Sequence, residues 1–308
     1  MARVKKRHGS RLSRYAETTF GFLAVRVLRA VRLLNPDTAS NVAGSIMRIV
    51  GPWLPEHRIG RANLAAAFPE KSAAEIESIL RGVWDNLGRT GAEFAHIDRL
   101  WDLDPSHRRT GRILNSDESE RIVLRLRDDG KPALIFAAHL GNWELAAVGA
   151  RSFDLDTTVL YRAPNMPAIS DAIIAMRAGC MGTLLPTRLD APVKLAEALQ
   201  RGSHVAMLVD QYYARGVPVT FFGRPTRANP LIARLARNVD CPIHGIRVIR
   251  YPGNRFQLHL SEAIAAPRDA DGRIDVEGTM QMITGVIEGW IREYPEQWLW
   301  VHRRWRDE

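Results

Sequence analysis

Short apolar runs alternate with amphipathic segments from residue 117 onward, and this alternation limits the folds that are open to the chain. Apolar runs of about four to eight residues are typical of strands inside a parallel sheet, and the segments between them have the apolar spacing of helices that cover such a sheet. The pattern predicts an α/β fold with a mainly parallel central sheet flanked by helices, preceded by a helical N-terminal segment. The predicted strands are 133–138, 157–161, 183–185, 204–209, 217–222, 243–249 and 256–260; the predicted helices are 39–50, 58–68, 72–87, 118–127, 143–150, 167–178, 195–200, 231–238 and 276–292.

The run His-Leu-Gly-Asn-Trp-Glu at 139–144 follows the first predicted strand and opens the next helix. Gly141 and Asn142 suit a tight turn, because both residue types tolerate unusual backbone angles and asparagine can cap a helix. Such a turn would bring the imidazole of His139 opposite the carboxylate of Glu144. A carboxylate there fixes the imidazole tautomer and supports the imidazolium that forms on proton transfer. We therefore interpret His139 as a general base and Glu144 as the group that orients it.

Spacing alone leaves a second interpretation open, in which His139 caps a helix and Glu144 is solvated. A pair of metal ligands is less favoured, because no third cluster of His, Cys or Asp stands nearby in the sequence. We therefore expect no metal ion and no cofactor.

Two further predicted strands end in polar or charged residues that could bind a substrate or take part in catalysis. The strand 157–161 ends at Tyr161 and Arg162, and the strand 204–209 is followed by Asp210 and Gln211. Ligands gather at the carboxyl ends of parallel strands, so these side chains and His139 should converge at one edge of the sheet. Taken singly, Arg162 could be a surface charge and Asp210 could cap a loop.

Composition narrows the class of protein. The 308 residues, 46% of them hydrophobic, are enough for one large domain or two modest ones with a substantial core, and we predict one domain with a helical N-terminal extension. A formal net charge of +9 draws the chain to anionic surfaces. Cys180 and Cys241 lie in no CxxC motif, which disfavours structural zinc and a disulfide framework. A nucleic-acid-binding protein is a weak alternative, because the basic residues form no recognised nucleic-acid module.

The first 57 residues are predicted to be basic, amphipathic helices that associate with a membrane, and residues 58–308 to form the catalytic domain. Within 19–34, Arg26, Arg29 and Arg32 recur every third residue and share one helical face, while apolar residues cover much of the rest. Such a helix would lie in the interface with its arginines toward lipid phosphates. An ordinary core helix and a cleaved signal peptide are the alternatives; against the signal peptide, arginines interrupt the apolar run and no small-residue cleavage site follows.

Several blocks of the sequence resemble the bacterial lipid A late acyltransferases, the lauroyl and myristoyl transferases within the wider lysophospholipid and glycerolipid acyltransferase group. The blocks keep the family's order and span residues 58 to 305. Two places depart from the family pattern: Tyr212 and Tyr213 stand where a second aspartate often follows Asp-Gln, and the stretch 226–230 differs from the family's Thr/Gly-rich run. The resembling blocks are 61–70, the His-x-x-x-x-Glu of 139–144, 161–165, Asp210-Gln211, Phe221-Phe222-Gly223 with Pro225, and 295–305.

The resemblance implies an O-acyltransferase at the cytoplasmic face of the inner membrane. It implies acyl-carrier-protein thioester as the donor, a hydroxyl of a lipid A precursor as the acceptor, and anionic membrane lipids as a further partner. Direct attack is expected, because the chain has no Gly-x-Ser-x-Gly elbow and neither cysteine follows a helix-opening signal. An acyltransferase that uses acyl-coenzyme A on a lysophospholipid or a glycolipid, and a binding protein with an inactive site, are the alternatives.

The resemblance also implies roles for individual residues. Arg177 matches an arginine important to activity and is expected to stabilise the oxyanion, with the backbone amide of Gly141 as a second donor and Asp210 holding the arginine in place. The alternative for Arg177 is a charge at the end of its helix that interacts with the helix dipole. Packing of the C-terminal tryptophans in the core is the alternative for the closing block, in which Arg303 and Arg304 are expected to contact lipid phosphate or the carrier protein. The remaining expected substrate-binding residues are Asn142, Tyr161, Arg162 and Gln211.

Overall fold

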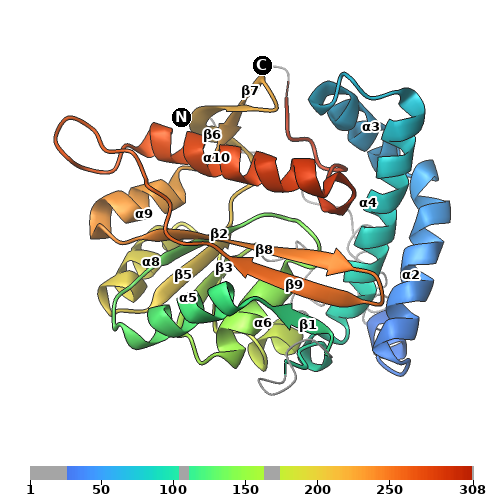
Figure 1. The fold of residues 1–308 in the computed structure, drawn as a ribbon, viewed down its shortest axis with the longest axis horizontal. Coiled ribbons are helices and arrows are strands. Elements are labelled where there is room, and N and C mark those ends of the chain that lie inside the picture. The colour runs from blue at the N-terminus through green and yellow to red at the C-terminus, as the bar shows by residue number, and fades with distance from the viewer. Residues whose placement is uncertain (1–25, 104–110, 163–173, 307–308) are drawn as a thin grey trace, which may run out of the picture.

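The computed structural model describes residues 26–103, 111–162 and 174–306, and a seven-stranded sheet runs through its middle (Figure 1). The strand order is β1-β9-β8-β2-β5-β3-β4, and every neighbouring pair is parallel except β8 with β9. This confirms the predicted α/β class with a mainly parallel sheet. The strands are β1 (Ile113–Asn115), β2 (Leu134–Ala137), β3 (Thr157–Tyr161), β4 (Thr183–Pro186), β5 (His204–Leu208), β8 (Ile243–Tyr251) and β9 (Arg255–Leu260).

Helices cover both faces of the sheet, because side chains alternate between the faces along each strand. Leu134 and Phe136 of β2 point to the face that α8, α9 and α10 cover, called the α10 face here, whereas Ile135 between them points to the α6 face, which α5 and α6 cover. The helices are α2 (Pro36–Val50), α3 (Pro55–Ala67), α4 (Ala73–Phe94), α5 (Asp117–Asp128), α6 (Glu144–Ser152), α8 (Ala191–Gln200), α9 (Leu231–Val239) and α10 (Val276–Glu293).

One predicted strand lies outside the main sheet. Residues 217–222 belong to β6 (Tyr212–Phe221), which pairs antiparallel with β7 (Arg224–Ala228) in a separate two-stranded hairpin. Phe222 and Gly223 join the two strands with φ of 52° and 69°, as a two-residue hairpin turn with both central residues left-handed requires. Strands β1 and β7 were not predicted from the sequence, because β1 is only three residues long and β7 carries two arginines and a proline. The predicted helix 167–178 falls mostly outside the described residues, of which 174–178 are helical.

Helix α4 stands at the carboxyl end of the sheet, and α2 packs along its outer side (Figure 1). Ser72 and Glu75 form the capping box that starts α4. Near its other end, Glu93 is 1% exposed and forms a salt bridge with Arg250 of β8. The same carboxylate accepts hydrogen bonds from Ser40 of α2 (2.6 Å) and Asn142 (2.8 Å), so one buried anion links two helices, a strand and the turn after β2.

The tight turn that the sequence predicted lies at 140–142, and its glycine is left-handed. Gly141 has a φ of +58°, and a Cβ at this position would lie 2.1 Å from the carbonyl oxygen of Val248, so only glycine fits. The expected cap of α6 by Asn142 is wrong. Trp143 is the residue before the helix and makes no side-chain cap, because the amide of Asn142 is turned inward to the buried Glu93.

The predicted interfacial helix 19–34 lies partly outside the described residues. Of its described part, residues 26–31 are helical. Arg32, expected on its lipid-facing side, instead makes a 2.5 Å ion pair with Asp98, which joins this segment to the end of α4. Within the described ranges, no helix is both long and apolar enough to span a membrane.

Replacing Glu93 should destabilise the fold strongly. We expect Glu93→Ala to lower the free energy of unfolding by about 3–5 kcal/mol, because it leaves the guanidinium of Arg250 buried without its carboxylate. Urea unfolding followed by tryptophan fluorescence measures this loss. The matched control is Glu262→Ala, which breaks solvent-exposed pairs with Arg121 and Arg125 and should leave the unfolding midpoint almost unchanged. Equal losses in the two variants would contradict the importance of the buried pair.

Candidate active site

The predicted convergence at the carboxyl edge of the sheet is present in the structure. His139 follows β2, Asp210 follows β5, and Tyr161 ends β3, and these three strands are neighbours in the sheet. The β2–β5 register pairs Ala137 with Leu208, so the residues two positions further on, His139 and Asp210, lie side by side.

The carboxylate that orients His139 is Asp210. Its Oδ1 lies 2.7 Å from Nδ1 of His139, and its Oδ2 accepts hydrogen bonds from the His139 backbone N–H (2.8 Å) and from Nε1 of Trp298 (2.7 Å). The prediction that Glu144 orients the imidazole is therefore wrong. The physical reason is that the turn 140–142 is held against the C-terminal segment, since Leu140 bridges to Trp298 and the Gly141 N–H donates to the Gln297 carbonyl, so Glu144 is carried away from the ring.

The charge of Asp210 sets the protonation of the pair. Burial raises the pKa of this carboxyl, but the nearby imidazole and three hydrogen bonds outweigh burial and lower the pKa to about 2. For His139, burial acts in the opposite direction and lowers the pKa. The negative charge of Asp210 and its hydrogen bond, with a smaller contribution from Glu144, outweigh burial, so the pKa of His139 is raised above its usual value. A neutral His139 donates its Nδ1 proton to Asp210, which leaves the Nε2 lone pair free to accept a proton.

Glu144 forms a two-pronged ion pair with Arg177. Nε of the arginine donates to one carboxylate oxygen (2.9 Å) and Nη2 to the other (2.5 Å). The guanidinium also lies over the rings of Phe94 and Tyr161, at 5.3 and 5.7 Å from their centroids. The prediction that Asp210 holds Arg177 is therefore wrong. Glu144, in the first turn of α6, pairs with Arg177, whereas Asp210, which follows β5, pairs with His139.

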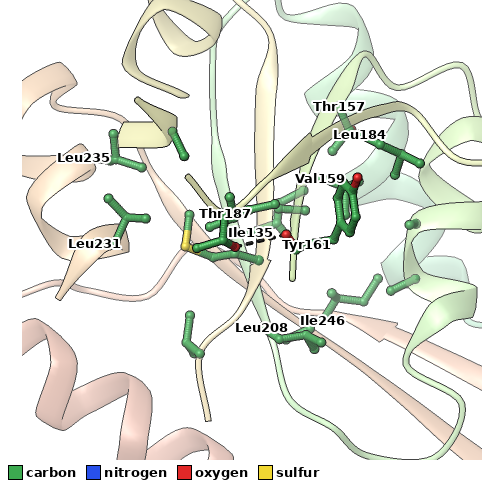
Figure 2. Close-up of a pocket in the computed structure, with 18 of the residues that line it drawn as sticks. Ile135, Thr157, Val159, Tyr161, Leu184, Thr187, Leu208, Leu231, Leu235 and Ile246 are labelled. Atoms are coloured by element: carbon green, nitrogen blue, oxygen red, sulfur yellow. Dashed lines mark hydrogen bonds between the residues drawn. The ribbon is translucent and has the colours of Figure 1, made fainter. Parts of the chain in front are cut away.

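Both groups open onto one cavity of about 1500 Å³. Because its lining residues come from both faces of the sheet, we divide this cavity into two parts. The first, called the α6 lobe, lies on the α6 face and is lined by apolar side chains such as Ile135, Val159 and Leu184. The second, the α8–α9 lobe, lies on the α10 face. In Figure 2, Leu231 and Leu235 of α9 approach the cavity from one side, while Thr157, Val159 and Leu184 line the other. The cavity wall includes six of the predicted site residues, His139, Glu144, Tyr161, Arg162, Arg177 and Gln211.

The predicted site residues of the closing block do not line the cavity. Arg304 is 2% exposed and donates to Thr226 Oγ1 (2.8 Å) and the Arg227 carbonyl (3.2 Å), and burial lowers its pKa to about 10. It lies in the core and off the cavity, so the prediction that it contacts substrate is wrong. Arg303 is exposed and does not line the cavity, and its contact with substrate stays a prediction. Trp298 and Trp300 are buried in the core, as the alternative of packing required.

Trp298 contributes to the site, although it was not among the predicted site residues. Its indole N–H fixes the Asp210 oxygen that does not contact the imidazole, and its bridge to Leu140 fixes the turn. The only sequence signal was its place in the closing block at 295–305.

Both cysteines are poor nucleophiles, since burial raises the pKa of Cys180 and of Cys241 to about 11, in keeping with the expectation of direct attack.

Comparison with known proteins gives one family. The model of the bacterial lipid A biosynthesis acyltransferases matches residues 6–307, nearly the whole chain. A search of curated proteins gives no match.

The dependence of the acyl-transfer rate on pH tests the His139–Asp210 pair. Because Asp210 raises the pKa of His139, the rate should fall on acidification through a pKa above 6.5. Asp210→Asn should lower kcat/KM by roughly 10²–10⁴-fold and move this acidic limb to lower pH, since burial then acts with less opposition. Profiles of kcat/KM against pH measure both effects.

The control for this substitution is Asp271→Asn, which changes an exposed carboxylate that is paired with Arg273 and does not line the cavity, and it should leave the profile unchanged. An acidic limb that stays in place in Asp210→Asn would mean that another group titrates.

Proposed function

The chain belongs to the bacterial lipid A biosynthesis acyltransferase family and is an O-acyltransferase, and we propose that it transfers a fatty acyl group from an acyl-carrier-protein thioester directly to a hydroxyl of a lipid A precursor. The observation that carries this proposal is the His139–Asp210 pair at the edge of a large, mainly apolar cavity. A base oriented by a carboxylate suits activation of a hydroxyl, and the cavity suits a hydrocarbon chain.

In the proposed reaction, Nε2 of His139 takes the proton of the acceptor hydroxyl as its oxygen attacks the thioester carbonyl carbon. The tetrahedral intermediate then collapses, the carbon–sulfur bond breaks, and the imidazolium returns its proton to the leaving thiolate. Asp210 keeps its negative charge throughout and stabilises the imidazolium. The side-chain amide of Gln211 lies 3.4 Å from Nε2, and the incoming hydroxyl would displace this weak contact.

Arg177 remains our choice for the donor that stabilises the oxyanion. Glu144 occupies its Nε and Nη2, and the second terminal nitrogen, Nη1, has no hydrogen-bond partner among the described residues. The pairing with Glu144 preorganises the guanidinium, which is the condition for strong electrostatic stabilisation of a developing charge. Gly141 is not retained as a donor, because its N–H is already bonded to the Gln297 carbonyl.

We assign the donor's acyl chain to the α6 lobe. This lobe extends from His139 back along β2 to Ile135, a distance of about 13 Å at the rise of a strand. Its deeper wall carries no charged side chain among the described residues, and Leu155, Leu258 and Leu260 there are buried. Each methylene that moves from water into such a wall contributes about 0.8 kcal/mol. We expect Tyr161 and Arg162, which line the cavity, to contact the thioester end of the donor.

We further propose that α2 rests on the membrane surface. Its outward side carries apolar residues at helical spacing, namely Val42, Ile46, Ile49 and Val50, and Trp53 follows at 80% exposure. Arg48 is exposed on the same helix, and the chain as a whole is strongly basic. Apolar and cationic groups together are what an amphipathic helix needs to bind an anionic lipid interface.

A panel of donors and acceptors tests the reaction. Purified enzyme is incubated with acyl-carrier-protein and coenzyme A thioesters, each with lipid A precursor or lysophospholipid. We expect acyl transfer from the carrier-protein thioester to the lipid A precursor, and a loss of roughly 10²–10⁴-fold in His139→Ala, which removes the base. Absence of transfer to every acceptor would refute the enzyme function. Preference for coenzyme A thioester and lysophospholipid would support the alternative substrate pair.

Flotation with anionic phospholipid vesicles tests the membrane surface. The double variant Ile46→Lys/Ile49→Lys should bind vesicles much more weakly, because it places two charges where the apolar side would enter the interface. The control is Ser45→Lys, an exposed position on the same helix, which adds charge without removing apolar surface. If the double variant floats as well as the unchanged protein, α2 is not the contact.

A further inference from the structure

Four arginines line the cavity and form no ion pair with a carboxylate among the described residues: Arg162, Arg188, Arg215 and Arg234. Asp190 interacts electrostatically with Arg188, but its ion pair is with Lys194. All four are exposed, and they come from separate parts of the chain that meet at the cavity. The other charged side chains of the wall are the paired Glu144 and Arg177 and the single carboxylate of Glu197. The cavity wall around these four arginines therefore carries more positive than negative charge.

Three of these arginines border the α8–α9 lobe. Arg234 projects from α9, Arg188 precedes α8, and Arg215 lies in β6. The lobe beneath them is apolar: Ala196 of α8 faces it, together with Leu231 and Leu235 of α9 (Figure 2 shows both leucines) and Met207 of β5. Apolar side chains also stand at its opening, where Leu189 and Val193 are 103% and 61% exposed. Unpaired cations beside an apolar groove match a ligand that is both anionic and hydrocarbon in character.

The sheet separates this lobe from the one assigned to the donor. In the registers of β5 with its neighbours, Ala206 lies beside Val159 and Ile135 on the α6 face, whereas Met207 lies beside Leu160 on the α10 face. The two lobes join at the carboxyl edge of the strands, where His139 and Gln211 stand. A chain in one lobe and a chain in the other would thus approach the base from opposite faces of the sheet.

We propose that the α8–α9 lobe is the acceptor subsite: Arg188, Arg215 and Arg234 bind a phosphate of the acceptor lipid, and a hydrocarbon chain already attached to that lipid lies in the groove between α8 and α9. This inference rests on the proposed function, because it divides the two substrates of that reaction between the two lobes. An acidic carrier protein would also be drawn to the arginines. It offers no second hydrocarbon for the groove, however, since its acyl chain occupies the α6 lobe.

Steady-state kinetics with each substrate varied in turn test the division. The double variant Arg188→Glu/Arg234→Glu should raise the KM for the acceptor lipid by at least about tenfold, since it removes charge-assisted hydrogen bonds to the phosphate and puts negative charge in their place. Ala196→Trp, which fills the groove, should also raise the acceptor KM. In both variants the KM for the acyl donor should change less than about threefold, which is under 1 kcal/mol.

Arg201→Glu is the control, because it makes one Arg→Glu change at an exposed position next to the end of α8 that is not part of the cavity wall, and it should leave both KM values unchanged. An unchanged acceptor KM in the double variant would overturn the inference while leaving the acyltransferase function intact. A rise in the donor KM instead would also overturn it, and would assign the arginines to the carrier protein. The charge variants lie at exposed positions, so they test the subsite even if Ala196→Trp does not fold. Absence of transfer by the unchanged enzyme, in contrast, would refute the proposed function itself.

Discussion

The parallel pairing of β2 with β5 is the constraint on which the active site depends. Parallel neighbours end at the same edge of a sheet, and the register of these two places the residues that follow Ala137 and Leu208 side by side. His139 therefore meets Asp210, although 71 residues separate them in the chain. The backbone N–H of His139 also bonds to the same carboxylate, so the ladder between the strands continues into the catalytic pair.

Two other segments hold this pair in a fixed geometry. The C-terminal block supplies Trp298, which bonds to Asp210, and Gln297, whose carbonyl accepts from the turn after His139. Helix α4 supplies Asn86 and Glu93, which bond to Gly141 and Asn142. Because the turn is bonded from both sides, it has little freedom to move the imidazole, and a base that is already oriented loses less free energy on reaching the transition state.

The sheet edge also explains how one base could serve two lipid substrates. Side chains alternate between faces along β3 and β5, so the same strands line an apolar lobe on the α6 face and a second lobe on the α10 face. His139 stands where the two lobes join. The charges differ between the lobes, since the deep wall of the α6 lobe is uncharged while unpaired arginines border the α8–α9 lobe. Such a difference can direct a neutral acyl chain and an anionic lipid to different sides of the base.

The amino-acid sequence by itself determined the fold class, most of the strands and helices, and the tight turn at Gly141, because periodicity and turn chemistry act over a few residues. It also located His139, Asp210 and Gln211 at strand ends. Only the tertiary structure decided which carboxylate serves which cation. Glu144 is five residues from His139 yet pairs with Arg177, and Asp210 is the partner of the base. Likewise Asn142 and Arg304, which seemed suited to a cap and to a phosphate, are buried in polar contacts of the core. The reason is that pairing across strands depends on strand order, register and burial, and these are set by contacts between residues far apart in the chain.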